Sequence, residues 1–315
     1  MASFVIAIQH PMSPTTRGAL EMGSAMSLLG SIGYFVLLSG LAPLDVVFWR
    51  CGFGLLTLAL ICTALGLWRR PSAKELSLAV LGGVAIVLNW VLLFGAYGRA
   101  SVTVATAVYN LQPFLLMGLG VVFFGERLSA ARLAWVGLAF AGMVLIVQAK
   151  PNAGYVGGDF GLGVAMALGA AALWAVAAVI TKRLAGMPAP LIALIQVAVG
   201  LLMLAPFADF GQLPQTALGW MPLVVLGAVH TGAMYALMYA GVQRLPTALQ
   251  GGLSFLYPVV AILVDWLALG HSLAPLQWLG AAAILLGAAG LFRASRPAPS
   301  GSPAPRRNPA RPSCP

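Results

Sequence analysis

The chain has 315 residues, of which 61% are hydrophobic and only 8% are charged, and its mean hydropathy is +0.96. Soluble proteins carry about 25% charged residues, so this chain cannot cover a water-facing surface and is expected to lie in a membrane. The formal net charge of +10 does not indicate nucleic-acid binding, because the basic residues lie in short connectors and a tail rather than on one folded face. The spacing of the three cysteines predicts no disulfide, metal or redox site.

Ten apolar runs are each long enough to cross a bilayer, which takes roughly 18 or more residues. Lipid offers the backbone no hydrogen-bond partner, and the runs lack the alternating polarity of barrel strands, so each is predicted to be a helix. In chain order the predicted helices are 18–39, 45–68, 76–97, 102–124, 131–149, 160–181, 189–208, 220–241, 246–269 and 275–293. The predicted fold class is therefore an all-α polytopic membrane protein with ten transmembrane helices.

Lysine and arginine are divided unequally between the connectors, and this division sets the expected orientation. With the N-terminus in the cytoplasm, fourteen of the 17 basic residues fall inside, whereas Arg99 and Lys150 fall outside and Arg50 lies within the second helix. Both termini are thus expected in the cytoplasm. Residues 1–17 would form a short cytoplasmic segment. Residues 294–315 would form a disordered, basic, proline-rich tail that touches anionic lipid.

The sequence matches itself when it is shifted by 145 positions, without a gap over 81–128. The matched pairs include Pro113 with Pro258, Arg99 with Arg244, and Gly125 with Gly270. Residues 18–149 and 160–293 are therefore predicted to be two five-helix repeats, and the odd number of helices inserts them in opposite orientations. Inverted repeats around a midplane site are typical of alternating-access transporters.

Two related stretches, AVYNLQP (107–113) and LSFLYP (253–258), place polar residues and a proline inside the fourth and ninth helices. These polar groups are expected to face a central cavity, since a proline at bilayer depth also leaves a backbone carbonyl free. The first stretch is followed by GERLS (125–129) and then by Trp135-x-Gly137. Over residues 18–293 this arrangement resembles the EamA-type members of the drug/metabolite transporter superfamily.

The resemblance implies a transporter of small organic solutes, such as amino acids, nucleotide-linked or quaternary metabolites, or drugs. It also implies a cavity lined by helices one, three, four, six, eight and nine, with helices five and ten as an outer scaffold. The second repeat departs from the pattern at His271, where the family commonly has a glutamate.

Polar and aromatic side chains gather near mid-depth in these lining helices, and they are the candidates for substrate binding. They are Tyr34, Asn89, Trp90, Tyr109, Asn110, Gln112, Trp174, His230, Tyr235, Gln250, Ser254 and Tyr257. Each could instead hydrogen-bond a neighbouring helix as a structural contact, and an aromatic ring could lie in the interfacial belt. His230 is also a candidate proton acceptor, because imidazole titrates near neutral pH.

Four further residues are candidates for gating or structural roles: Arg50, Pro113, Pro258 and Asp265. An unpaired arginine in lipid costs about 2.5–3.5 kcal/mol. Arg50 is therefore expected to pair with Asp45 or Asp265, or to reach the interface, and a gating role is favoured over substrate contact.

The predicted function is secondary transport, with export favoured, of a small organic metabolite such as an amino acid across a bacterial inner (plasma) membrane. Uptake or exchange of a cationic or quaternary metabolite and drug efflux are alternatives, and a structural or sensory membrane protein is the non-transport alternative. No enzyme activity, catalytic residue, cofactor or metal is expected, because no nucleotide-binding motif, nucleophile–base pair or metal cluster is visible. The expected partners are the small-molecule substrate, membrane lipids and, as a candidate coupling ion, protons; the chain would be a monomer or a homodimer.

Overall fold

The computed structural model describes residues 13–148, 159–270 and 274–295. Within these residues it contains helices and no strands, and ten of the helices are long and apolar enough to cross a membrane. The predicted all-α class and the ten crossings are confirmed. The first twelve residues, His271 and the tail from residue 296 lie outside the described part.

The elements divide into two halves of five crossings each. The first half contains α2 (Pro14–Gly30), α3 (Ile32–Ser39), α4 (Pro43–Ala64), α5 (Ala73–Tyr109), α6 (Gln112–Phe124) and α7 (Ala130–Gln148). The second half contains α8 (Phe160–Arg183), α9 (Ala189–Leu204), the short η1 (Ala205–Phe207) and η2 (Phe210–Gln212), α10 (Ala217–Gly227), the π-helical η3 (Ala228–Ala233), α11 (Met234–Arg244), α12 (Thr247–Ser254), α13 (Leu256–Leu269) and α14 (Pro275–Ala294). Several crossings are built from more than one element, as in the first, where α2 and α3 follow one another.

α5 contains parts of two membrane crossings, although its backbone is helical throughout. The Nδ2 atom of Asn89 donates to the hydroxyl of Tyr109 at 3.3 Å, and both residues belong to α5. Twenty residues of straight helix would separate them by about 30 Å. The chain therefore reverses direction within α5, between the crossings Ala73–Tyr97 and Val104–Phe124.

Both mid-membrane prolines follow a break in a helix. The fourth crossing breaks at Asn110, just before Pro113, and the ninth breaks at Phe255, just before Pro258. A proline has no N–H and its ring clashes with the carbonyl four residues earlier, so it cannot continue a regular helix. The two breaks lie 145 residues apart, as the sequence repeat predicts.

The same two crossings also end alike. α6 closes on Gly125, with φ of 63°, and α13 is followed by Gly270, with φ of 68°. The left-handed backbone conformation at both positions favours glycine, which has no Cβ. The repeat is thus preserved in the backbone as well as in the sequence.

The first helix of each repeat packs against the other repeat through a glycine. A Cβ atom on Gly18 of α2 would lie 2.9 Å from the Cβ of Arg244, and one on Gly163 of α8 would lie 2.9 Å from the Cβ of Arg99. Gly163 lies near the start of α8 and Lys182 near its end. Lys182 donates from Nζ to the backbone carbonyl of Leu245, the residue after Arg244, at 2.8 Å. Arg99 and Arg244 therefore lie at opposite ends of the bundle, as inverted repeats require. We call these the Arg99 end and the basic end.

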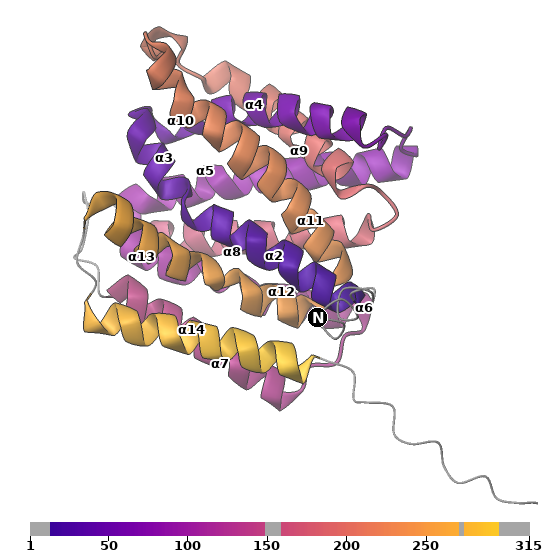
Figure 1. Ribbon diagram of the computed structural model, residues 1–315, viewed down its shortest axis with the longest axis vertical. Coiled ribbons are helices and arrows are strands. Elements are labelled where there is room, and N and C mark those ends of the chain that lie inside the picture. The colour runs from indigo at the N-terminus through magenta and orange to yellow at the C-terminus, as the bar shows by residue number, and fades with distance from the viewer. Residues whose placement is uncertain (1–12, 149–158, 271–273, 296–315) are drawn as a thin grey trace, which may run out of the picture.

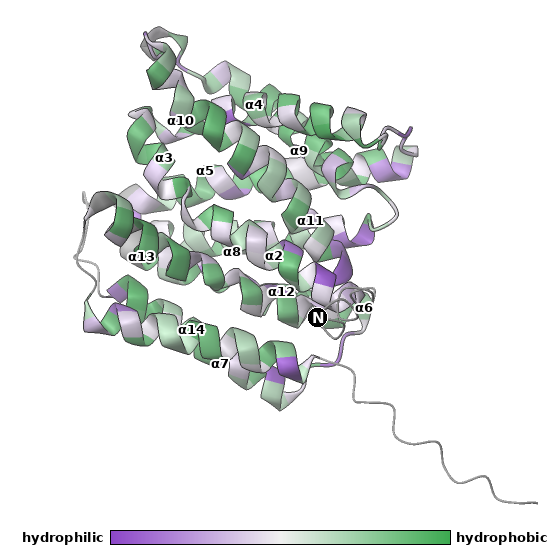
Figure 2. Ribbon diagram, viewed as in Figure 1, coloured by the Kyte–Doolittle hydropathy of each residue, from purple (hydrophilic) through white to green (hydrophobic). Residues whose placement is uncertain are grey.

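α7 and α14 lie side by side along one edge of the bundle, far from α4, α9 and α10 at the other edge (Figure 1). The two helices meet through glycines, since a Cβ atom on Gly142 would lie 2.5 Å from the carbonyl oxygen of Gly280. Small residues permit such close approach in a membrane, where lipid gives helices little hydrophobic reason to associate. Apolar residues dominate the helices, and several of the most hydrophilic residues lie near helix ends and connectors (Figure 2).

Single cysteines at positions 99 and 244, in a variant without the three native cysteines, test this arrangement. We expect a membrane-impermeant maleimide to label Arg99→Cys in intact cells and Arg244→Cys only after permeabilisation, because the positive-inside rule places the basic end in the cytoplasm. Arg17→Cys serves as the control for the basic end. Labelling of positions 99 and 244 from the same side would contradict the inverted arrangement.

Candidate functional site

Two asparagines and four tyrosines from both repeats gather between the middle of the bundle and its Arg99 end. This central cluster consists of Asn89, Tyr97, Tyr109, Asn110, Tyr235 and Tyr257. Asn89 is fully buried, and its Nδ2 donates to the Ala170 carbonyl of α8 at 2.7 Å as well as to Tyr109. This one amide therefore joins the third, fourth and sixth crossings.

Asn110 and Tyr257 join the two repeats at the helix breaks. The Nδ2 atom of Asn110 donates to the Tyr257 hydroxyl at 3.0 Å, and that hydroxyl lies 3.3 Å from Oδ1 of the same asparagine. The phenols of Tyr97, Tyr235 and Tyr257 lie close enough to Tyr109 to interact with it electrostatically. The four phenols thus lie near one another.

Three buried amide oxygens lack a hydrogen-bond partner among the described residues. They are Oδ1 of Asn89 in the central cluster, Oε1 of Gln112, which follows Asn110 by two residues, and Oε1 of Gln250. Buried polar atoms in proteins nearly always have a partner, so these acceptors indicate places where water or a bound molecule supplies a donor. The phenols and amides of the central cluster offer hydroxyls, amide oxygens and aromatic faces, and these groups suit ammonium and hydroxyl groups.

Arg50 of α4 is buried, with 6% of its surface exposed. Its Nε donates to Oγ1 of Thr231 at 3.1 Å, and its guanidinium carbon lies 5.4 Å from the centre of the Trp90 ring, which is a cation–π contact. The expected partner Asp45 instead accepts a hydrogen bond from the backbone N–H of Asp209 at 2.7 Å. Arg50 therefore reaches inward to the eighth crossing rather than outward to the interface.

The eighth crossing is distorted where Arg50 meets it. In the π-helical η3, Oγ1 of Thr231 donates to the Leu226 carbonyl at 3.0 Å. Nδ1 of His230 lies 3.3 Å from the Val225 carbonyl, which is also five residues earlier. The other ring nitrogen of His230 lies 2.8 Å from Oγ of Ser31, at the break between α2 and α3. Both ring nitrogens thus have protein partners, which favours a structural role for this histidine over direct substrate contact.

Other candidate residues are bonded within their surroundings rather than to the central cluster. Gln250 donates from Nε2 to two backbone carbonyls at 2.7 and 3.1 Å, and Ser254 donates to the Gly251 carbonyl at 2.6 Å. Pro113 packs against Gly251, where an added Cβ would lie 2.9 Å from the proline Cβ. Tyr34 packs against the aromatic ring that follows it in sequence.

Trp174 lines a small pocket in the basic half of the bundle. The pocket is formed by Ile86, Trp174, Ala177, Ala178, Met238, Tyr239 and Val242. The Tyr239 hydroxyl donates to Oε1 of Gln196, and Tyr239 is 3% exposed, so it belongs to the core. Pro258 is buried in α13, and the side chain of Asp265 on the same helix lies outside the described part of the chain.

Polar contacts between the repeats close the basic end. Glu126, between α6 and α7, accepts from Nζ of Lys182 at 2.6 Å and from the backbone N–H and hydroxyl of Thr247 at 2.9 and 2.6 Å. Glu21 of α2 pairs with Arg244 of α11. In each pair the first repeat supplies the carboxylate and the second supplies the cation.

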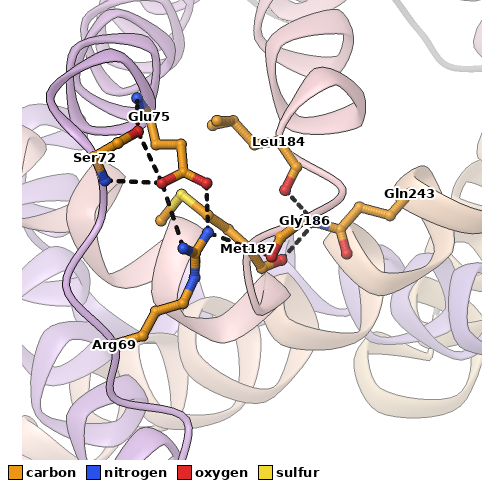
Figure 3. Close-up of polar contacts among 7 residues, drawn as sticks. All are labelled: Arg69, Ser72, Glu75, Leu184, Gly186, Met187 and Gln243. Atoms are coloured by element: carbon orange, nitrogen blue, oxygen red, sulfur yellow. Dashed lines mark hydrogen bonds and ion pairs between the residues drawn. The ribbon is translucent and has the colours of Figure 1, made fainter.

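The connector between α4 and α5 also bonds the second repeat at the basic end (Figure 3). Arg69 pairs with Glu75 at 2.5 Å, and the carboxylate of Glu75 also caps the start of α5. Arg69 then donates to the Gly186 carbonyl of the second repeat at 3.3 Å. Within the second repeat, Gln243 donates to the carbonyls of Leu184 and Met187 at 3.2 and 3.0 Å, in the connector between α8 and α9 that also contains Gly186.

The comparison with known families agrees with this architecture. The EamA-like transporter family matches residues 19–148 and 161–293, which together make up most of the chain. The chain belongs to the EamA-like transporter family. It is accordingly a multi-pass membrane transporter.

Relatives of this EamA-like transporter cover most of its length. An uncharacterized transporter of Bacillus subtilis (strain 168), YxxF, is 30% identical over 87% of this chain and 89% of its own. A probable terminal-alkyne amino-acid exporter of Streptantibioticus cattleyicolor is 29% identical over 76% of this chain and 79% of its own. A riboflavin transporter of Rhizobium johnstonii is 29% identical over 85% and 88%. A solved crystal structure with 23% identity has a TM-score of 0.78 and covers 89% of this chain and 97% of its own, so the fold is shared.

Three residues in or near the central cluster and Arg50 are absent from the substrate-binding and gating candidates that the sequence provides. Tyr97 ends the third crossing and looks like an interfacial tyrosine, whereas the reversal in α5 carries it to the central cluster. Thr231 carries no signal of its own, because a threonine in a helix usually bonds its own backbone. Gln196 does carry a sequence signal, since it occupies the place in the seventh crossing that is equivalent to the place of Arg50 in the second.

The carboxylate of Glu126 at the basic end of this EamA-like protein has a lowered pKa. Burial acts to raise the pKa, but hydrogen bonds from Lys182 and Thr247 and the charge of Lys182 outweigh it and hold the pKa below the ordinary value of 4.5. A group with a lowered folded-state pKa stabilises the protein above its unfolded-state pKa. That stabilisation is lost as the pH falls through the folded-state pKa.

We expect Glu126→Gln to lower the Tm of the detergent-solubilised protein by a few degrees at pH 7, because a neutral amide binds Lys182 less strongly. The difference from the wild type should shrink as the pH falls below about 4.5, where the wild-type carboxylate itself takes up a proton. Differential scanning fluorimetry at a series of pH values, from neutral pH down through the folded-state pKa of Glu126, measures both. A difference that is independent of pH would show that the charge of Glu126 is not what joins the repeats.

Proposed function

We propose that the chain exports a small zwitterionic metabolite, such as an amino acid, across a bacterial inner membrane by alternating access around the central cluster. The observation that carries this proposal is that both repeats contribute to the cluster at their helix breaks. A site formed between two repeats opens to either side in turn when one repeat moves against the other. Residues 18–149 and 160–293 are the proposed moving units.

The substrate class follows from the groups that line the cluster. Phenol rings attract an ammonium group to their faces, and amide and hydroxyl oxygens accept its hydrogen bonds. The unpartnered oxygens of Asn89 and Gln112 add two such acceptors. The name of the Streptantibioticus relative points in the same direction, but the riboflavin transporter shows that similar chains carry other solutes. The proposal therefore rests on the site.

The closed basic end supports a state that faces away from the cytoplasm. Opening towards the cytoplasm would require the contacts of Glu126 with Lys182 and of Glu21 with Arg244 to part, since each joins one repeat to the other. If transport is coupled to protons, His230 is the proposed proton acceptor, because imidazole titrates near neutral pH. Its bond to Ser31 links it to the break in the first crossing.

A second candidate is a cationic or quaternary solute. The four phenols favour it, because a quaternary ammonium group needs aromatic faces and no hydrogen-bond acceptors. The two candidates differ in whether the solute carries a carboxylate.

Counterflow in proteoliposomes tests the function directly. Vesicles loaded with unlabelled L-threonine or L-homoserine are expected to accumulate the labelled amino acid transiently, and a pH gradient should change the rate if protons are coupled. Parallel vesicles contain choline or riboflavin. Exchange of choline alone would favour the cationic candidate, and exchange of none of the solutes would contradict the proposed function.

Asn110→Ala tests the central cluster. We expect the half-saturating concentration of the exchanged amino acid to rise about three- to tenfold, because the variant removes the bond to Tyr257 and one hydrogen bond is worth about 0.5–1.5 kcal/mol. Gln215→Ala is the matched control, since it removes an amide in an exposed connector that bonds only its neighbouring backbone among the described residues. Equal counterflow by the wild type and Asn110→Ala would remove this residue from the binding site.

A further inference from the structure

We propose that Arg50 binds the carboxylate of the transported solute, and that the chain therefore selects zwitterions over amines. This inference rests on the proposed transport of amino acids and names the group that recognises them. It differs from the gating role that the sequence favours for Arg50.

Arg50 carries a buried positive charge that needs a partner. A guanidinium group is always protonated, and a buried charge is stable only when it is paired or well hydrogen-bonded. Among the described contacts, Arg50 has one hydrogen bond, from Nε to the neutral hydroxyl of Thr231, and the face of Trp90. The fork of terminal N–H groups that matches a carboxylate is thus left for another partner.

The acidic residues whose side chains the structure describes are all engaged elsewhere. The chain has seven aspartates and glutamates. Six have other partners: Glu21 with Arg244, Glu75 with Arg69, Glu126 with Lys182, Asp45 with the backbone of Asp209, Asp159 with the start of α8, and Asp209 with the start of η2. The seventh, Asp265, has a side chain outside the described part, and its helix α13 packs against α2, α3 and α14. Within the described residues, Arg50 therefore has no carboxylate partner.

Arg50 also lies close to the central cluster. Its guanidinium lies over Trp90, the residue that follows Asn89 in α5, and it is close enough to Tyr235 for an electrostatic interaction. Tyr235 in turn interacts with Tyr109. The guanidinium thus lies beside the central cluster, whose neutral groups include Oδ1 of Asn89, an acceptor without a partner among the described residues. A cation beside neutral acceptors matches a carboxylate and an ammonium group on one small molecule.

Competition for counterflow separates this role from a structural one. The probes are L-threonine and L-homoserine, each paired with its carboxamide, which keeps the ammonium group and lacks the carboxylate. For the wild type we expect the amino acid to compete about tenfold or more better than its amide, because hydrogen bonds to a charged group are the strong ones. In Arg50→Gln, binding of the amino acid should weaken by a factor of about ten or more, whereas binding of the amide should change little. The preference for the amino acid should therefore disappear.

Three further variants make the result decisive. Arg50→Lys should keep a reduced preference for the carboxylate, since an ammonium group binds it without the bidentate fork, and it serves as the test if Arg50→Gln does not fold. Arg99→Gln removes an exposed arginine whose described bond is to its own helix, and should leave the preference unchanged. Asp265→Asn should also leave it unchanged; loss of the preference in this variant would identify Asp265 as the partner of Arg50 and overturn the proposal.

The outcomes distinguish this inference from the proposed function. Vesicles that exchange amino acids but accept the amides equally well would refute the role of Arg50 and leave amino-acid transport standing. The same holds if Arg50→Gln weakens amino acid and amide by the same factor, which is what a structural arginine predicts. Vesicles that exchange no amino acid would refute the proposed function, and this inference with it.

Discussion

A polar group inside a bilayer has no water to bind, and this constraint governs where the chain places its few polar side chains. The amides of Asn89 and Asn110 donate to a backbone carbonyl or a phenol of another crossing. Pro113 and Pro258 add to the requirement, because each removes an N–H and leaves the carbonyl four residues earlier without its helical donor. Polar groups therefore concentrate where the helices break, and the breaks of both repeats meet near the centre of the bundle. The same features that would be costly against lipid become useful where a polar solute can satisfy them.

The number of crossings and the repeat could be predicted from the sequence, because each depends on a property of one short stretch. Apolar length marks a crossing, and Pro113 and Pro258 mark the breaks. Contacts between crossings could not be predicted in the same way. The sequence suggests that Arg50 pairs with Asp45 or Asp265 or reaches the interface. Arg50 instead bonds Thr231, 181 positions away, and no local pattern distinguishes that threonine from others. Which polar residues meet is decided by how the helices pack, and a pattern along one helix does not record it.

Different chemistry joins the repeats at the two ends of the bundle. At the basic end the pair of Glu126 and Lys182 is 18% and 16% exposed, and water competes for such groups. Water can solvate the two charges again when they separate, so a partly buried contact of this kind can part and re-form in a transport cycle. Towards the Arg99 end, the rings of Trp49 and Trp220 meet edge to face at 4.8 Å between centres. Aromatic packing of this kind does not depend on charge, so pH and salt should affect the basic end far more.

The repeats are alike in backbone but not in charge, and this difference explains how a symmetric scaffold can recognise an asymmetric solute. Arg50 and Gln196 occupy equivalent places in the second and seventh crossings, both are buried, and both bond the eighth crossing, through Thr231 and Tyr239. The amide of Gln196 needs no counter-charge, whereas the guanidinium of Arg50 does. Two similar repeats can exchange contacts and give inward and outward states of comparable energy. If the solute is a zwitterion, as proposed, the single cation of Arg50 would hold its carboxylate near the second crossing and leave its ammonium group to the phenols. The shared backbone would then supply the movement, and the single charge would supply the selectivity.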